Sequence, residues 1–136
     1  MNNSEQGAKL TNKGMISLLW IVVMLNMAFA DILSFITPGS LQQMMTGYAG
    51  ELKITQSLLF VFALLLEIPI AMIFLSRLMN RKSNRVLNLI ASVITIVFII
   101  GGGSATPHYI FFSSIEVICM LAIIIICLKW PKEQAN

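Results

Sequence analysis

Four long apolar segments constrain this chain more than any other feature, and the short connections and terminal tails around them together hold most of the charged residues. The segments cover approximately residues 15–36, 56–78, 86–103 and 107–129. Each reaches or approaches the ~20 helical residues that cross a bilayer core. We therefore expect an all-α fold, a four-transmembrane-helix bundle. Residues 1–136 would form a single integral membrane domain, with 1–14 and 131–136 as polar tails.

The composition supports lipid as the solvent of this chain. Hydrophobic residues make up 57% of it and charged residues only 11%, whereas soluble domains carry about 25% charged residues. The net charge of +3 does not indicate nucleic-acid binding, because no basic stripe interleaved with aromatic residues accompanies it. The lipid bilayer is the expected partner.

The basic residues predict the orientation in the membrane. Eight of the nine lie at one end of the predicted bundle, before the first segment, around the connection between the second and third, or around the end of the fourth: Lys9, Lys13, Arg77, Arg81, Lys82, Arg85, Lys129 and Lys132. Only Lys53 lies in the other connections. Because cytoplasmic loops collect Lys and Arg, we expect a multi-pass protein of the cell (cytoplasmic or inner) membrane with both termini in the cytoplasm.

The first apolar segment also has features of a cleaved signal peptide. Lys9 and Lys13 precede an apolar run, and residues 28–30 read Ala-Phe-Ala, which fits an A-x-A cleavage site. However, the apolar run resumes as far as Ile36, so the segment is long enough to span. We therefore favour an uncleaved first span.

The connection between the first two spans carries its own pattern. Leu41, Met44, Met45, Tyr48 and Leu52 recur at spacings of three and four residues. This pattern predicts a short amphipathic helix on the outer surface. We interpret it as an anchor in the headgroup layer, with a lid over the bundle as the alternative.

Three acids lie inside the predicted spans: Asp31, Glu67 and Glu116. Ionisable groups inside a membrane are costly and usually face the bundle interior or a wet cavity. A rise of ~1.5 Å per residue places all three in the outer half of the bilayer, together with Asn26. His108 lies at the outer end of the fourth span. We therefore take these five residues as candidates for ligand or proton binding.

Pro69 lies two residues after Glu67. It cannot donate a hydrogen bond to the carbonyl of Leu65, so we predict a helix break near mid-membrane. Such breaks are tolerated where the backbone faces protein or water. The alternative is that Glu67 is only hydrogen-bonded within the bundle.

The sequence shows none of the common catalytic or cofactor patterns. It contains no nucleophile–base pair, no phosphate-binding loop and no haem-ligand pair, and the acids match no metal motif. Cys119 and Cys127 are too far apart on one helix for a disulfide. We therefore expect no catalytic residues, no cofactor and no metal; these patterns leave open whether the protein is an enzyme and favour one that is not.

Three short segments carry a resemblance to known proteins. MLNMAFADILS at 24–34, LEIPIAM at 66–72 and TPHY at 106–109 resemble a family of uncharacterised small four-span prokaryotic membrane proteins, distantly similar to the DoxX-like group. The resemblance covers most of the chain from Trp20 to Trp130. It implies a four-helix bundle in a membrane but no activity and no catalytic residues.

Small multidrug transporters share the size and number of spans. Their hallmark is a single acid in the first span, whereas three acids are distributed here. Their binding site is therefore not transferred to this chain.

The leading functional hypothesis is a binding or transport protein without enzymatic activity. A protonatable polar pocket in the outer half of the bilayer would take a proton and a small cationic or hydrogen-bonding ligand. The alternatives are a quinone- or lipid-binding membrane subunit of a redox system, and a membrane scaffold with no ligand. A homo-oligomer is compatible with all three hypotheses.

Overall fold

The computed structural model describes residues 10–131, which fold into five helices and one two-stranded sheet. Within this range, four helices are long and apolar enough to cross a membrane. They confirm the predicted all-α bundle. The elements are α1 (Asn12–Ile36), α2 (Ser40–Met45), β1 (Tyr48–Ala49), β2 (Leu52–Lys53), α3 (Gln56–Leu78), α4 (Arg81–Gly101) and α5 (Pro107–Lys129).

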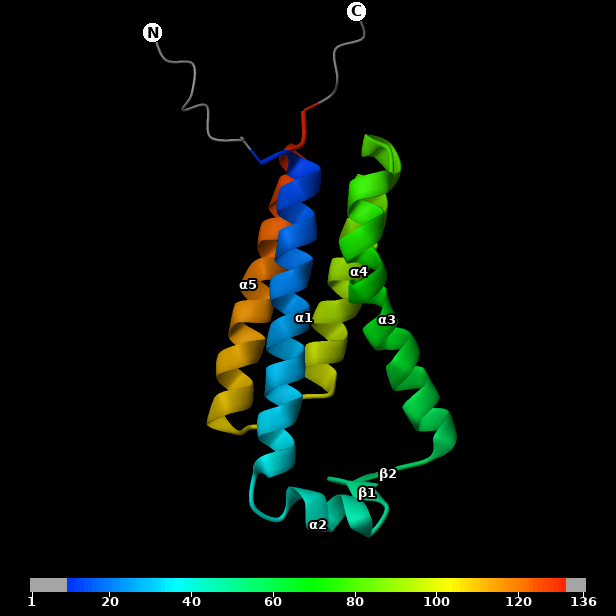
Figure 1. Cartoon of the computed structure of the whole chain (residues 1–136), viewed down its shortest axis with the longest axis vertical. Coiled ribbons are helices and arrows are strands. Elements are labelled where there is room, and N and C mark those ends of the chain that lie inside the picture. Colours follow the sequence, from blue (N-terminus) through cyan, green and yellow to red (C-terminus); the bar gives the residue numbers. More distant parts are fainter. Residues whose placement is uncertain (1–9, 132–136) are drawn as a thin grey trace, which may run out of the picture.

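The four long helices form an antiparallel bundle (Figure 1). α1 and α4 each pack against both α3 and α5, so α1 and α4 face each other across the diagonal. We call the end where α1 begins, α5 ends and α3 meets α4 the basic end, and the opposite end the α2 end. Lys9 and Lys132, together with most of the predicted polar tails, lie outside the described residues.

Side-chain caps lie at the beginning of three of the long helices, and two of these helices begin earlier than predicted. The side chain of Asn80 accepts a hydrogen bond from the Ser83 amide (3.0 Å). α4 therefore begins at Arg81, more than a turn before the predicted residue 86. Thr11 accepts from the amide of Gly14 in the same way (3.2 Å), so α1 also begins before the predicted residue 15. Such caps satisfy amides that have no partner within the helix.

The first turns of α4 also cap the end of α5. Arg81 Nη2 donates to the Trp130 carbonyl oxygen (2.6 Å). Arg85 donates through Nε to the Cys127 carbonyl and through Nη2 to the Leu128 carbonyl. The last carbonyls of a helix lack partners within the helix and attract cations. These two arginines therefore fix the packing of α4 against α5 at the basic end.

The connection after α1 differs in part from the prediction. The short helix is present as α2, but it ends at Met45, whereas the periodicity extended it to Leu52. Gly47 (φ 87°) and Gly50 (φ 63°) adopt a left-handed conformation that favours glycine. They redirect the chain into a hairpin in which Tyr48 pairs with Lys53.

α3 continues through Pro69 as one helix, so the break predicted there does not divide the span. Pro69 is buried, and the half of α3 that precedes it leans away from the rest of the bundle (Figure 1). A proline within a helix removes one hydrogen bond and bends the helix. The proline therefore changes the direction of α3 instead of ending it.

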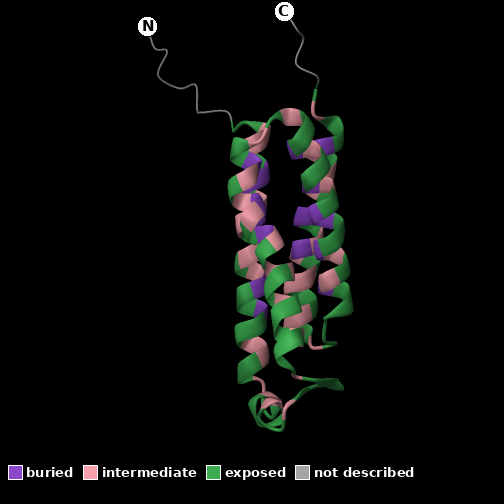
Figure 2. Ribbon diagram, turned by 90° about the vertical axis from the view of Figure 1, so that its right-hand side faces the viewer, coloured by how far each residue is buried: buried purple, intermediate pink, exposed green. Residues whose placement is uncertain are grey.

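Buried residues lie on the inward faces of the helices, and the outer faces are exposed (Figure 2). Large apolar side chains cover this outer surface. Phe60 on α3 is 65% exposed and Val97 on α4 is 66% exposed. An exterior of this kind suits lipid as the surrounding solvent.

Candidate functional site

A cavity of about 190 Å³ lies within the bundle toward the α2 end. All four long helices contribute to its wall, so it is formed only when the bundle is assembled. We call it the acid cavity because two carboxyl side chains line it. Its lining residues are Met27, Ala30, Asp31, Phe62, Leu66, Phe98, Ile99, Gly102, Tyr109 and Glu116.

Glu116 is the most deeply buried polar group of this cavity. Its side chain is 3% exposed, and Oε1 has no hydrogen-bond partner among the described residues. α5 directs Glu116 inward because it lies on the same buried face as Met120, Ile123 and Cys127. Leaving a buried polar group unpaired is costly, so this oxygen is available to a ligand or to water.

Two hydroxyl groups of α4 share this lack of partners. Ser92 Oγ and Thr95 Oγ1 are buried and unpaired within the described residues. Tyr109 bonds to Ile99 near the α2 end, and Arg85 of α4 bonds to the end of α5 at the basic end. The antiparallel register between these contacts places the turn that carries Ser92 and Thr95 level with Glu116.

Asp31 lies on α1 beside the buried Ala30, but its own side chain is exposed. It therefore lines the cavity while remaining accessible from the surface of the bundle. Glu116 forms the deep end of the cavity and Asp31 an accessible edge. A ligand that reaches Asp31 would have Glu116 further inside.

Tyr109 separates the acid cavity from a second hollow. Its hydroxyl donates to the Ile99 carbonyl oxygen (2.9 Å). Its ring packs closely on Gly103, where an added Cβ would meet the ring carbon Cε1 at 2.6 Å. Only glycine fits at position 103 without displacing the ring.

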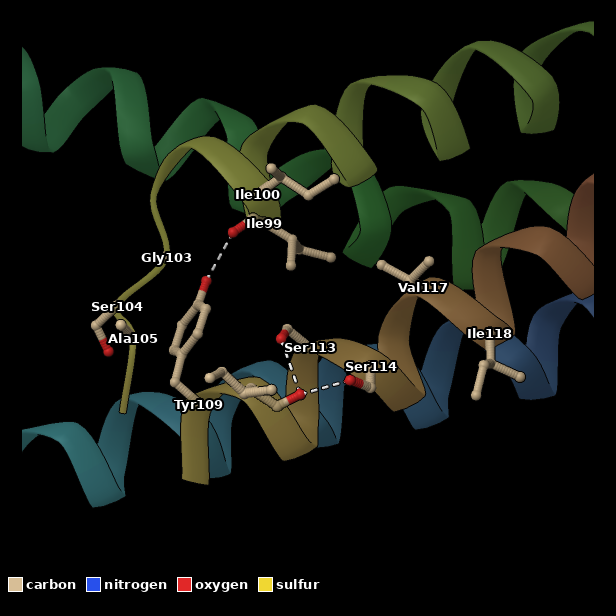
Figure 3. Close-up of a pocket in the computed structure, with 11 residues that line it drawn as sticks. Ile99, Ile100, Gly103, Ser104, Ala105, Tyr109, Ser113, Ser114, Val117 and Ile118 are labelled. Atoms are coloured by element: carbon tan, nitrogen blue, oxygen red, sulfur yellow. Dashed lines mark hydrogen bonds between the residues drawn. The ribbon is translucent and has the colours of Figure 1, made fainter. Parts of the chain in front are cut away.

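The second hollow is an open groove of about 560 Å³ between α4 and α5 (Figure 3). Its walls are largely apolar, and the hydroxyls of Ser113 and Ser114 both donate to the Ile110 carbonyl oxygen. Because these hydroxyls already have partners, the groove presents mainly hydrocarbon. Tyr109 and Ile99 line both the groove and the acid cavity.

The structure brings together only some of the predicted site residues. Asp31 and Glu116 share the acid cavity. Glu67 does not line it and lies exposed on α3. Asn26 turns back to bond the Val22 carbonyl of its own helix (2.8 Å). His108 lies near the α2 end of the bundle, 3.3 Å from the Ser34 hydroxyl, and is outside the residues that line the cavity.

The structure also contains a buried polar network that the sequence analysis missed. Trp20 Nε1 (2.6 Å) and Ser76 Oγ (3.2 Å) both donate to Asn88 Oδ1. Asn88 Nδ2 donates to Asn84 Oδ1 (2.6 Å), and Asn84 donates to the Ser76 carbonyl. Trp20 fits the pattern of an interfacial aromatic residue, but it is fully buried. One sequence feature could have indicated this network: Asn84 lies four residues before Asn88, so both lie on one face of α4.

A second group of hydrogen bonds continues this network toward the basic end. Ser17 Oγ donates to the Ile73 carbonyl (2.8 Å), and Arg77 Nε donates to Ser17 Oγ (3.1 Å). The network therefore joins α1, α3 and α4, while the acid cavity lies nearer the α2 end. We assign the network to structure because most of its polar groups are paired with one another.

Comparison with known proteins gives a family and no activity. No curated protein and no solved structure matches this chain. A family model matches residues 7–136, nearly the whole length. The chain therefore belongs to a family of unknown function, DUF6326.

Proposed function

We propose that this protein binds a small organic cation in the acid cavity in exchange for a proton, and that it carries the cation across the membrane. The observation that supports the proposal is Glu116, a buried carboxyl group with an unpaired oxygen at the wall of a cavity that holds a second acid. A carboxyl group can hold either a proton or a cation, so the two can compete for one site.

The lining of the cavity favours an organic cation over a metal ion. Among the described residues, no Lys, Arg or His lines the cavity. The aromatic residues Phe62, Phe98 and Tyr109 also line the cavity, and aromatic rings attract ammonium groups. Two carboxyl groups and a phenol provide fewer oxygens than the six to eight ligands that Ca²⁺ takes. The acids, the aromatic lining and the small number of oxygens therefore favour an alkylammonium group.

We also propose that the basic end faces the cytoplasm and that the membrane is the cell membrane. The described basic residues at that end are Lys13, Arg77, Arg81, Lys82, Arg85 and Lys129, whereas Lys53 alone lies near the α2 end. Positive charge retained in the cytoplasm supports this orientation. The acid cavity would then lie in the outer half of the bilayer.

Cysteine labelling in intact cells tests the orientation. Glu51→Cys, between β1 and β2, should react with a membrane-impermeant maleimide added outside. Ser83→Cys, at the start of α4, should react only after the cells are opened. The native Cys119 and Cys127 are buried, and labelling of the parent protein measures the background that they contribute. Labelling of Ser83→Cys in intact cells would reverse the proposed orientation.

Calorimetry of the purified protein in nanodiscs tests cation binding. Alkylammonium ions from methylammonium to tetraethylammonium serve as probes, in buffers of different ionisation enthalpy. Binding should release a proton and should strengthen as pH rises, until the carboxyl group is fully ionised. Glu116→Gln cannot exchange a proton, so it should weaken binding roughly tenfold or more and abolish the proton release.

Glu67→Gln is the matched control, because it makes the same chemical change outside the cavity. It should leave cation binding and proton release unchanged. Equal losses in both variants, or no binding of any alkylammonium ion, would contradict the proposal.

The groove between α4 and α5 favours a second candidate, a quinone- or lipid-binding subunit of a redox system. Its apolar walls (Figure 3) suit a hydrocarbon tail, and Tyr109 lines both this groove and the acid cavity. The test is whether quinone or lipid copurifies with the parent and is lost in a variant with a filled groove, such as Ser113→Phe. That result would favour the quinone- or lipid-binding role over cation binding.

A further inference from the structure

Glu67 is an acid on a membrane-spanning helix, on the side of the helix that faces away from the bundle. It is the twelfth of the 23 residues of α3, so it lies close to the middle of the helix. Its side chain is exposed and is outside the acid cavity. A carboxyl group facing hydrocarbon at this depth is costly, and such groups are normally covered by protein or water. The exposed face of α3 therefore needs a partner.

The residues around Glu67 form a surface suited to helix packing. Ala63 and Ala71 lie four residues before and after it, and Phe60 and Phe74 lie seven residues before and after it. The two phenylalanine rings are each 65% exposed. This stripe therefore has large side chains at both ends, small side chains nearer the middle, and one acid at its centre.

This arrangement fits two helices that cross at Glu67. Small residues one turn on either side of a crossing point let helix backbones approach closely in membranes. Helices that cross at an angle separate toward both ends. The rings of Phe60 and Phe74 would occupy the wider space there.

We infer that a second copy of this chain covers the face, with the two α3 helices crossing at Glu67. A two-fold axis along the membrane normal brings each residue to the same depth as its copy. The two Glu67 side chains then meet, and a protonated carboxyl group both donates and accepts. A pair of such groups satisfies its own hydrogen bonds, without a basic partner. This dimer goes beyond the proposed cation binding and does not depend on it.

Disulfide cross-linking tests the geometry. Ala63→Cys, near the crossing point, should form a covalent dimer in membranes under mild oxidation. Val97→Cys is the matched control: Val97 is exposed on α4, and the contact between Phe62 and Phe98 (centroids 5.9 Å apart) places it at the same depth as Ala63. The control should remain monomeric, because disulfides need Cα atoms within about 7 Å. Equal cross-linking of both, cross-linking of neither, or a product containing only a different protein would overturn the inference.

Energy transfer between labelled copies in vesicles tests the chemistry of Glu67. Glu67→Leu removes the paired hydrogen bonds and should weaken dimerisation about tenfold. Glu67→Gln keeps a donor and an acceptor and should retain the dimer. Val97→Ala, on the exposed face of α4, should leave dimerisation unchanged. If Glu67→Leu dimerises as well as the parent, or if the parent stays monomeric at every protein-to-lipid ratio, Glu67 does not form a dimer contact.

Discussion

Asn88→Ala should reduce the free energy of unfolding by about 3 kcal/mol, because three buried partners would lose their hydrogen bonds at once. Trp20 Nε1 and Ser76 Oγ share Asn88 Oδ1 as their acceptor, and Asn84 accepts from its amide nitrogen. All four side chains are fully buried. Water cannot replace the lost bonds without entering the bundle.

Unfolding in mixed micelles, followed by the fluorescence of Trp20, measures this loss. A Trp130→Phe background makes Trp20 the only reporter, since the chain has two tryptophans. The emission of the folded Asn88→Ala variant should also change, because the indole N–H loses its acceptor.

Asn26→Ala is the control for this prediction. Asn26 makes the same kind of hydrogen bond, but to the Val22 carbonyl of its own helix. Its loss should change the stability by less than about 0.5 kcal/mol, partly offset by the better helix propensity of alanine. If the two variants unfold alike, the network does not hold α1, α3 and α4 together.

The sequence predicted the helices well because lipid imposes a simple rule. Each span needs a long apolar run. Residues that end or begin helices, such as Thr37-Pro38-Gly39 and Thr106-Pro107, mark its limits. α1 ends at Ile36 and α5 begins at Pro107, as expected from those residues. The beginnings of α1 and α4 were predicted less well, because their capped first turns are polar and resemble loop.

The sequence could not predict which acids face inward. Asp31, Glu67 and Glu116 are all surrounded by apolar residues. The hydropathy pattern therefore does not show which side of each helix faces the bundle interior. On α3, the acid Glu67 was expected to face the bundle interior or a wet cavity. The residues that actually turn inward are Pro69, Met72 and Ser76, which are placed by packing against distant helices.

Trp20 shows the same limitation on α1. Its position near a predicted span boundary is typical of an interfacial aromatic residue. Its acceptor, Asn88, lies 68 residues further along the chain. Only the assembled bundle brings them together, so no local pattern could have revealed the pair.

Glu116→Leu should raise the free energy of unfolding by roughly 2–3 kcal/mol while abolishing cation binding. The parent buries a carboxyl group whose Oε1 has no partner among the described residues. Leucine replaces this group with hydrocarbon of similar size, in a cavity already lined by Met27, Leu66 and Ile99. Opposite changes in stability and binding are typical of a residue retained for function.

Glu116→Gln separates the role of charge from the role of polarity in this experiment. The amide remains polar and unpaired, so the stability should stay within about 1 kcal/mol of the parent. The same mixed-micelle unfolding measures both variants. A loss of stability in Glu116→Leu would show instead that Glu116 is held by hydrogen bonds, with Ser92 and Thr95, level with it on α4, as candidate partners. In that case the carboxyl group would be part of the scaffold and not a binding group.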